Sequence, residues 1–237
     1  MATSTGRGAC AVITGASRGI GHAAAERFAA AGYGVVNLSR SPSSLEGVVN
    51  IAVDLAAPDW SAAAGPALRA AVAGAPTISL VHNSALKLAG GVDEVEAADL
   101  RQMLEVAVVA PAILNRLLLG EMRPGSSIIY IGSTLSQRAT RGMAAYVACK
   151  HAVLGLMRST CQDLAGRQIH SCCVNPGFTD TEMLRSYGGE ALAHLAGLST
   201  QNRLIAPSEI AELICFAAAN PVVNGAALNA DLGFIEP

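Results

Sequence analysis

The sequence predicts an α/β fold in which one doubly wound parallel sheet carries helices on both faces. Short β-branched apolar runs alternate with alanine-rich segments along the chain, as is typical of this class. The runs are almost continuously apolar, which indicates strands that are covered on both sides. A length of 237 residues, with 51% apolar and 14% charged residues, suffices for one such domain with a large core.

Seven apolar runs are predicted as strands and the segments between them as helices. The strands lie near Ala9–Thr14, Gly34–Ser39, Val48–Val53, Thr77–Asn83, Ser126–Gly132, Ile169–Asn175 and Ala226–Asp231. The helices are Ile20–Ala31, Trp60–Ala73, Leu100–Leu119, Met143–Leu164, a shorter piece near Glu182–Leu195, and Pro207–Ala219, which opens with proline in its first turn. We expect a single domain over residues 1–237, with a polar tail over residues 1–8.

Composition excludes several classes of partner. The 16 basic and 18 acidic residues are scattered, and no run of Lys or Arg predicts nucleic-acid binding. No apolar run approaches the ~20 residues that cross a bilayer, so we expect no membrane insertion. The 6 cysteines lack metal-ligand spacing and the polar start lacks a signal sequence. We therefore expect reduced thiols, no metal site and a cytoplasmic location.

A glycine-rich turn joins the first predicted strand to the first helix. It reads Thr14-Gly15-Ala16-Ser17-Arg18-Gly19-Ile20-Gly21. Glycines in such a turn permit a tight bend, close approach of a pyrophosphate and close packing of the helix on the sheet. The helix N-terminus adds free N–H groups and a positive dipole end. The turn predicts a Rossmann-type dinucleotide site that includes Gly15, Ser17, Arg18, Gly19, Ile20 and Gly21.

The end of the second strand favours NADP(H) over NAD(H). NAD-binding sheets carry an acidic residue here, about 20 residues beyond the glycines, to bind the ribose 2′-hydroxyl. This chain instead reads Leu38-Ser39-Arg40. Arg40 offers a forked guanidinium and Ser39 a hydroxyl to a 2′-phosphate, and Arg18 could add a second cation.

Ser133, Tyr146 and Lys150 form a candidate catalytic group. Ser133 follows the fifth predicted strand, and Tyr146 and Lys150 stand four residues apart in the following helix. Residues with this spacing share a helix face. Open α/β sheets bind ligands at the carboxyl ends of their strands, so we expect the three side chains to meet beside the cofactor.

Together these motifs resemble the classical short-chain dehydrogenase/reductase family. The resemblance covers essentially the whole chain and rests on Thr14–Gly21, Asn83, Ser133, Tyr146-Val147-Ala148-Cys149-Lys150 and Asn175-Pro176-Gly177. It implies that Tyr146 donates a proton to a carbonyl oxygen, on which negative charge develops as hydride arrives. The Lys150 ammonium would favour the phenolate and bind the nicotinamide ribose, and Ser133 would donate to the substrate oxygen.

The resemblance also implies further cofactor contacts. Asp54 matches the acid that faces the adenine, Asn83 the residue that steadies the central sheet, and Thr181 a hydroxyl beside the carboxamide or phosphates. The alternative is local turn or cap chemistry, which Asp, Asn and Thr also perform. The expected set is Asp54, Leu55, Asn83, Pro176, Gly177, Thr179 and Thr181, in addition to Tyr146 and Lys150.

Two segments of the chain depart from the family pattern. Ala107 stands where members usually carry an Asn that holds a water in the proton relay from lysine to solvent. Alanine has no side-chain donor or acceptor, so either backbone carbonyls and another polar group hold the water, or proton resupply is slower. The second departure is His82-Asn83-Ser84-Ala85 in place of Asn-Asn-Ala-Gly.

The sequence thus predicts an NADPH-dependent reductase of a ketone or 3-oxoacyl-type carbonyl. The alternative is a nucleotide-binding relative with little turnover that acts as a cofactor sensor or scaffold; only Ala107 supports it. Residues 181–204 are expected to close over a moderately apolar substrate, with movement at Gly188-Gly189 and Arg185 and Arg203 as the cations of the rim. The long helices Leu100–Leu119 and Met143–Leu164 predict a homodimer or homotetramer.

Overall fold

One parallel sheet organises the computed structural model, which describes residues 8–234. Its strand order is β3-β2-β1-β4-β5-β6-β7, and every neighbouring pair is parallel. The strands are β1 (Cys10–Thr14), β2 (Gly34–Ser39), β3 (Val49–Ala52), β4 (Ile78–His82), β5 (Ser127–Ile131), β6 (His170–Pro176) and β7 (Ala227–Ala230). These confirm the seven predicted strands. Residues 1–7 of the expected tail lie outside the described residues.

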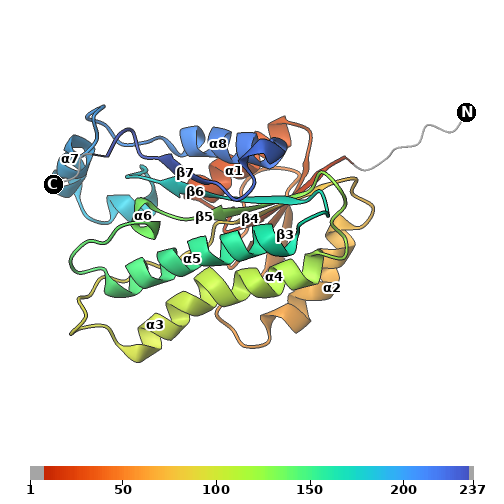
Figure 1. Ribbon diagram of the computed structural model, residues 1–237, viewed down its shortest axis with the longest axis horizontal. Helices are drawn as coiled ribbons and strands as arrows, with labels where there is room; N and C mark the ends of the chain where they lie inside the picture. Colours follow the sequence, from red (N-terminus) through yellow and green to blue (C-terminus); the bar gives the residue numbers. More distant parts are fainter. Residues whose placement is uncertain (1–7, 235–237) are drawn as a thin grey trace, which may run out of the picture.

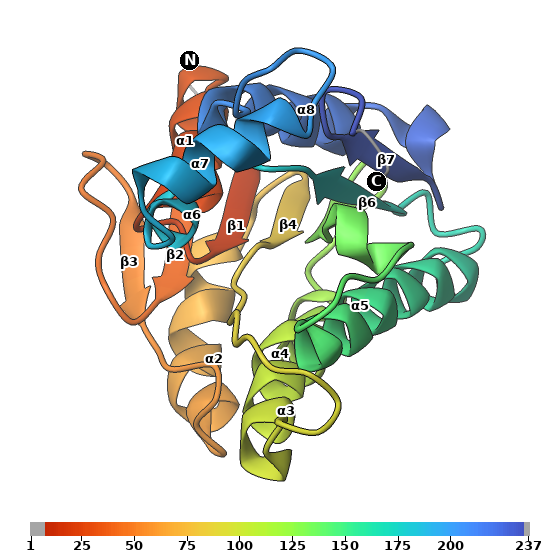
Figure 2. The same ribbon diagram turned by 90° about the vertical axis from the view of Figure 1, so that its left-hand side faces the viewer.

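Helices cover both faces of the sheet, as predicted. Figure 1 shows α1 and α8 on one face and α2, α4 and α5 on the other. The helices are α1 (Gly19–Ala30), α2 (Trp60–Val72), α3 (Ala97–Leu104), α4 (Ala110–Leu118), α5 (Ala144–Asp163), α6 (Glu182–Arg185), α7 (Gly189–Gly197) and α8 (Pro207–Ala219). In Figure 2, α6 and α7 lie over one end of the sheet, near β1 and β2.

Alternation of side chains along the strands divides the core into two layers. Leu80 and Ile128 pack toward α2, α4 and α5, whereas their neighbours Val81 and Ile129 pack toward α1 and α8. Successive strand residues point to opposite faces, so each β-branched run supplies both layers at once. The continuous apolar runs of the sequence therefore reflect burial on two sides.

The predicted helix Leu100–Leu119 is present but is interrupted by a wider turn. It begins earlier, at Ala97, and residues Glu105–Val109 (η1) form a π-helical segment between α3 and α4. Pro111 explains the interruption, because proline has no N–H for the carbonyl four residues earlier and its ring crowds that carbonyl. That carbonyl belongs to Ala107, the residue at which the sequence departs from the family.

The predicted piece near Glu182–Leu195 is divided into two helices. α6 ends at Arg185 and α7 starts at Gly189, after Gly188 with φ of 86°. Such a positive φ favours glycine and breaks a right-handed helix. The break turns α7 back over the carboxyl end of the sheet.

The thiols pack as small apolar groups. All 6 cysteines of the sequence occur as thiols, and Cys10, Cys149, Cys172 and Cys173 are buried. Burial raises the pKa of the Cys172 thiol to about 12 and that of Cys173 to about 11. Residues 8–234 also contain no helix with the length and apolar character that a bilayer crossing requires.

Candidate active site

A cavity of about 1230 Å³ opens between the carboxyl ends of the strands and the helices α6 and α7. The residues predicted from the sequence for cofactor binding and catalysis line it, with the exception of Gly21. Arg40 and Asp54 lie in its wall after β2 and β3, Ser133 follows β5, and Tyr146 and Lys150 belong to α5. The cavity thus brings together segments that are far apart in the chain.

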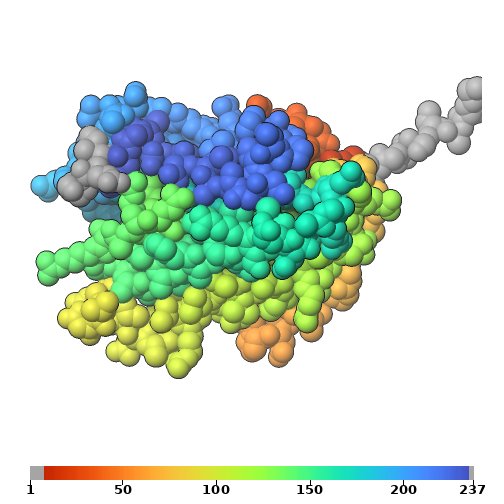
Figure 3. Space-filling view, in the orientation of Figure 1, coloured from red at the N-terminus to blue at the C-terminus, as the bar shows by residue number. Residues whose placement is uncertain are grey.

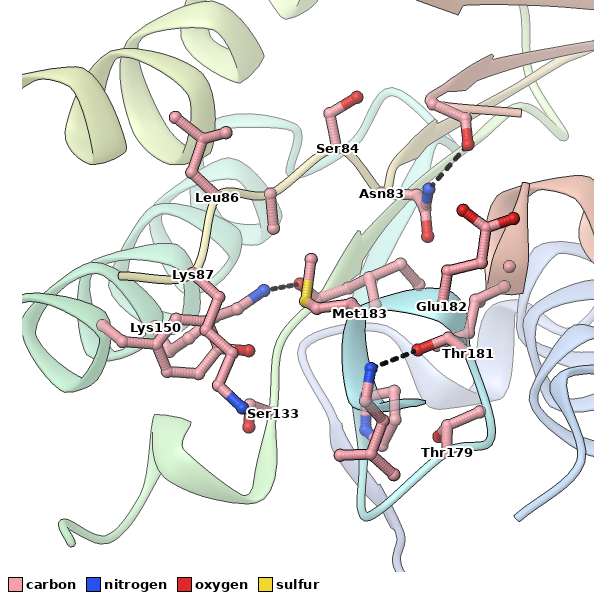
Figure 4. A pocket seen from close by; sticks show the side chains of 18 of the residues that line it. Asn83, Ser84, Leu86, Lys87, Ser133, Lys150, Thr179, Thr181, Glu182 and Met183 are labelled. Atoms are coloured by element: carbon pink, nitrogen blue, oxygen red, sulfur yellow. Dashed lines mark hydrogen bonds between the residues drawn. The ribbon is translucent and has the colours of Figure 1, made fainter. Parts of the chain in front are cut away.

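The glycine turn is tied to the end of β4. Asn83 Nδ2 donates to the carbonyl oxygens of Thr14, at 2.9 Å, and Gly15, at 3.2 Å. The Thr14 hydroxyl oxygen in turn accepts the backbone N–H of Asn83 and of Ser84, both at 2.9 Å. Figure 4 shows the Asn83 side chain directed at this turn. Asn83 therefore ties the end of β4 to the glycine turn through its side-chain amide.

Gly21 lies beneath the turn and leaves no room for a side chain. A Cβ at this position would overlap the Gly15 carbonyl oxygen and the Asn83 amide nitrogen. Close packing of α1 on the turn requires glycine here, because even a methyl group would push the helix away. Its absence from the cavity wall follows from this supporting position.

Asn37 is a site residue that the sequence analysis missed. Its Oδ1 accepts the N–H of Ala16 in the glycine turn at 2.9 Å, and its Nδ2 donates to Ser41 O at 3.1 Å and Asn50 Oδ1 at 2.9 Å. The side chain is only 1% exposed. The sequence did carry a signal for this role: Asn37 is a single amide inside the apolar strand Val35-Val36-Asn37-Leu38. Buried polar groups need hydrogen-bond partners, so an amide at this place indicates a bond to a neighbouring segment.

The polar groups after β2 and β3 are partly engaged in local bonds. Ser39 Oγ donates to Ser41 O at 2.6 Å, and Asp54 Oδ1 accepts the N–H of Ala56 at 3.0 Å. Asp54 thus bonds a backbone group of its own turn, which is the alternative to a cofactor contact, and it also lines the cavity. Arg40 is exposed and also lines the cavity.

Arg18 contacts helix α6 across the mouth of the cavity. Its Nη1 lies 3.0 Å from Glu182 Oε2, and the two side chains are 67% and 66% exposed. An exposed ion pair of this kind contributes little stability and can exchange its partner. The side chain of Thr181, next to Glu182, lies close to the position that a Cβ at Gly19 would occupy. Its hydroxyl oxygen accepts the N–H of Leu184 and so caps α6. The start of α6 therefore lies directly over the glycine turn.

Lys150 is held at the point where the β4–β5 ladder stops. Gly132 N bonds Val174 O on β6, so the preceding residue Ile131 turns its carbonyl toward β4. If the ladder continued, the N–H of Ser84 would donate to that carbonyl. It donates to the Thr14 hydroxyl oxygen instead. Lys150 Nζ takes the place of this donor at 2.9 Å, and its side chain is only 4% exposed.

Ser133 and Tyr146 flank the lysine. Ser133 Oγ accepts the N–H of Leu135 at 3.2 Å, which leaves its hydroxyl hydrogen available to another acceptor. Lys150 Nζ lies 5.6 Å from the centroid of the Tyr146 ring. Figure 4 shows Ser133 and Lys150 on one side of the cavity and Thr179, Thr181 and Met183 on the other. The arrangement offers a hydroxyl donor, a phenol and an ammonium to one ligand.

The wall of the cavity formed by α6 and the segment after it is largely apolar. Met183, Leu184 and Tyr187 line it from α6 and the segment that follows. Lys87, which sequence analysis also missed, places its ammonium 4.4 Å from the centroid of the Tyr187 ring. This contact joins the segment after β4 to the segment between α6 and α7.

The two cations expected on the rim are both paired with carboxylates. Arg185 Nε bonds Asp180 at 2.7 Å and lowers the pKa of that carboxyl. Arg203 bonds Glu209 at 2.7 Å and lowers the pKa of that carboxyl to about 2. Neither guanidinium is therefore an uncompensated charge at the rim.

The sheet order, the glycine turn at the start of α1 and the cavity at the carboxyl ends define a Rossmann-type dinucleotide-binding protein. Comparison with known families gives the particular class. Residues 9–191 match the short chain dehydrogenase family. The chain belongs to this family, whose members are oxidoreductases acting on CH–OH and C=O groups.

Individual relatives extend along almost the full chain. A 3-oxoacyl-(acyl-carrier-protein) reductase of Escherichia coli K12, FabG, is 26% identical over 230 residues, covering 90% of this chain and 91% of that protein. A short-chain dehydrogenase/reductase structure from Serratia marcescens is 32% identical, with a TM-score of 0.86 and coverage of 97% and 98%. A Burkholderia cenocepacia short chain dehydrogenase in complex with NADP is 29% identical, with a TM-score of 0.85 and coverage of 96% and 98%.

We predict that Asn37→Leu weakens binding of the dinucleotide. The substitution keeps the volume of the side chain but leaves the Ala16 N–H without its acceptor. We expect the free energy of unfolding to fall by about 1–3 kcal/mol and the Kd for NADPH to rise about tenfold, measured by denaturant titration and calorimetry.

Ser79→Ala is the matched control, because it removes a buried hydrogen bond to Ser127 within the sheet and outside the cavity wall. It should lower stability and leave the Kd unchanged. An unaltered Kd in Asn37→Leu would contradict the positioning role of Asn37.

Proposed function

We propose that the protein is an NADPH-dependent reductase of a ketone or 3-oxoacyl-type carbonyl. The observation that carries the proposal is the shared cavity: Ser133, Tyr146 and Lys150 line the same space as the glycine turn. A dinucleotide seated on that turn would extend toward the three side chains, because ligands of open α/β sheets lie across the carboxyl ends of the strands.

The residues present fit NADP(H). The backbone of the glycine turn and the N-terminus of α1 offer N–H groups to the pyrophosphate, and Gly19 leaves the space beneath Thr181 open. Arg40 offers a guanidinium to the 2′-phosphate, and no carboxylate stands beside it in the sequence Leu38-Ser39-Arg40. When bound, the nicotinamide supplies hydride to the carbonyl carbon.

Each side chain of the trio has a distinct part in this chemistry. Ser133 donates its free hydroxyl hydrogen to the carbonyl oxygen and orients it. Tyr146 gives its phenolic proton to that oxygen as negative charge develops there. The buried Lys150 ammonium favours the resulting phenolate through its positive charge. Its bond to Ile131 fixes the distance at which it acts.

The size and lining of the cavity support a moderately apolar carbonyl substrate. The wall formed by Met183, Leu184 and Tyr187 favours an alkyl or acyl chain. The similarity to the 3-oxoacyl-(acyl-carrier-protein) reductase of Escherichia coli also supports a 3-oxoacyl group as substrate. A nucleotide-binding protein with little turnover is the second candidate, and Ala107 is the observation that favours it.

The exposed faces of α4 and α5 support assembly into a homodimer or homotetramer. The two helices lie side by side on one face of the molecule (Figure 3), and Val109, at the junction with α4, is 39% exposed. Small and apolar side chains on these faces suit helix packing between copies. Sedimentation velocity should give a dimer or tetramer; a monomer alone would exclude this assembly.

We predict that Tyr146→Phe abolishes reduction but not cofactor binding. Loss of the proton donor should lower kcat about 10²–10⁴-fold, while the Kd for NADPH stays nearly unchanged. NADPH oxidation is followed with a panel of ketones and 3-oxoacyl thioesters. Tyr33→Phe, at a tyrosine outside the cavity wall, is the control and should keep full activity. Retained turnover in Tyr146→Phe would refute the role, and no turnover by the unaltered protein would favour the sensor.

We predict that Arg40 sets the cofactor preference. Arg40→Ala should raise the Kd for NADPH at least about tenfold, because it removes a charge-assisted hydrogen bond, and should leave the Kd for NADH unchanged. Arg69→Ala on α2 is the matched control. Equal affinity of the unaltered protein for the two cofactors, or the same preference after substitution, would contradict the assignment.

A further inference from the structure

Lys87 is a cationic side chain of the cavity wall without a carboxylate partner among residues 8–234. Its ammonium lies 4.4 Å from the centroid of the Tyr187 ring and forms no hydrogen bond or ion pair within that part of the chain. Two described residues of the wall carry carboxylates, Asp54 after β3 and Glu182 in α6. Asp54 follows the edge strand, which β2 and β1 separate from β4, and Glu182 pairs with Arg18. The three N–H groups of the Lys87 ammonium are therefore available to an anionic ligand.

The position of Lys87 separates it from the cations expected to meet the cofactor. Arg18 and Arg40 follow β1 and β2, whereas Lys87 follows β4, on the side of β1 that leads to β5. Figure 4 shows the chain running from Asn83 to Lys87, with the Lys87 side chain directed into the cavity on the same side as Ser133. A dinucleotide whose phosphates lie at the glycine turn would therefore leave the Lys87 ammonium to the second ligand.

Backbone hydrogen bonds tie the segment of Lys87 to the start of α5. Gly90 N donates to Gly142 O at 2.8 Å, and Ala144 N donates to Gly90 O at 3.1 Å. Gly90 stands shortly after Lys87 in the chain, and Ala144 shortly before Tyr146. The two hydrogen bonds therefore join the segment that carries the ammonium to the segment that carries the phenol of the proposed proton donor.

The contact with Tyr187 brings the ammonium to the apolar wall of the cavity. Lys87 is half-buried, and Met183, Leu184 and Tyr187 line the wall that it reaches. A charge in such a place is less well hydrated than one at an open surface, so an opposite charge is attracted more strongly. The face of an aromatic ring attracts a cation but carries no formal charge. The ammonium can therefore keep its contact with the ring and bind an anion at the same time.

We propose that Lys87 is a specificity-determining residue that binds a carboxylate of the carbonyl substrate, so that oxo acids are preferred to neutral ketones. The inference rests on the proposed reductase function and narrows its substrate class. A single ammonium matches the single charge of a carboxylate, whereas a phosphate dianion calls for further cations or a helix N-terminus. The carboxylate takes no part in the reaction. Hydride from NADPH reaches the carbonyl carbon, the proton of Tyr146 reaches the carbonyl oxygen, and the products are the hydroxy acid and NADP⁺.

The first test compares oxo acids with their methyl esters. Straight-chain oxo acids, with the ketone at increasing distance from the carboxylate, are assayed with NADPH beside the esters, which keep the ketone and lose the charge. We expect kcat/KM for the best acid of the series to exceed that for its ester at least about tenfold, because only the acid makes a charge-assisted hydrogen bond. Esters reduced as well as their acids throughout the series would overturn the proposal and leave the reductase function standing.

Substitution of Lys87 tests the residue itself. Lys87→Met keeps the length of the side chain and removes the charge, so KM for the acid should rise about tenfold or more. The kcat, the kinetics with the ester and the Kd for NADPH should change little, as expected for lost binding of the substrate alone. Lys87→Arg keeps the charge and should keep the preference for the acid. Arg101→Met, at an exposed cation of α3 outside the cavity wall, is the matched control and should change the kinetics of neither substrate.

The comparison of acid and ester also separates charge from packing. Lys87→Met removes the contact with the Tyr187 ring as well as the charge. An equal loss for acid and ester would mean that Lys87 only supports the wall through this contact, which would overturn the proposal.

Binding without turnover separates the proposal from the reductase function. Calorimetry of the protein with NADP⁺ measures the Kd of the same acids and esters. If no carbonyl is reduced, but an acid binds more tightly than its ester and Lys87→Met removes the difference, the reductase function fails and the carboxylate site stands. If no carbonyl is reduced and no acid binds more tightly than its ester, both fail.

Discussion

The site depends on the two hydrogen bonds that the Thr14 hydroxyl oxygen accepts at the end of β1. By taking the N–H groups of both Asn83 and Ser84, this oxygen draws the chain away from β5 just after β4 ends. The Asn83 amide then returns bonds to the glycine turn, and the Ile131 carbonyl is left for Lys150. One hydroxyl thereby couples the position of the nucleotide turn to that of the candidate catalytic lysine.

This coupling uses backbone N–H and C=O groups that would otherwise pair with each other within the sheet. A parallel ladder satisfies its own N–H and C=O groups, and each interruption must supply substitutes. Here the substitutes are side chains of the site: Thr14 and Asn83 on the nucleotide side, Lys150 on the catalytic side. Asn37 acts in a similar way, because its side-chain amide bonds both the glycine turn and the segment after β2.

The sequence was sufficient to predict the strands, both helical layers and a set of candidate cofactor and catalytic residues, all of which except Gly21 line the cavity. Strand periodicity and the turn Thr14–Gly21 depend on local patterns, and Tyr146 and Lys150 share a helix face by spacing alone. Asn37 and Lys87 escaped prediction because their roles depend on partners distant in sequence. The wider turn at Ala107 was also missed, although Pro111 carried its signal, since the conformation depends on packing of the whole helix.

The comparisons place the chain in a family of oxidoreductases. The carbonyl reduction proposed for it depends on the arrangement of Ser133, Tyr146 and Lys150 around one cavity. The most direct test is a single turnover with NADPH that carries deuterium at the transferable position of the nicotinamide, mixed with a 3-oxoacyl substrate. We expect an alcohol with deuterium on its carbinol carbon, formed as the NADPH absorbance disappears. Label that remains on the cofactor, with the ketone unchanged, would contradict the account.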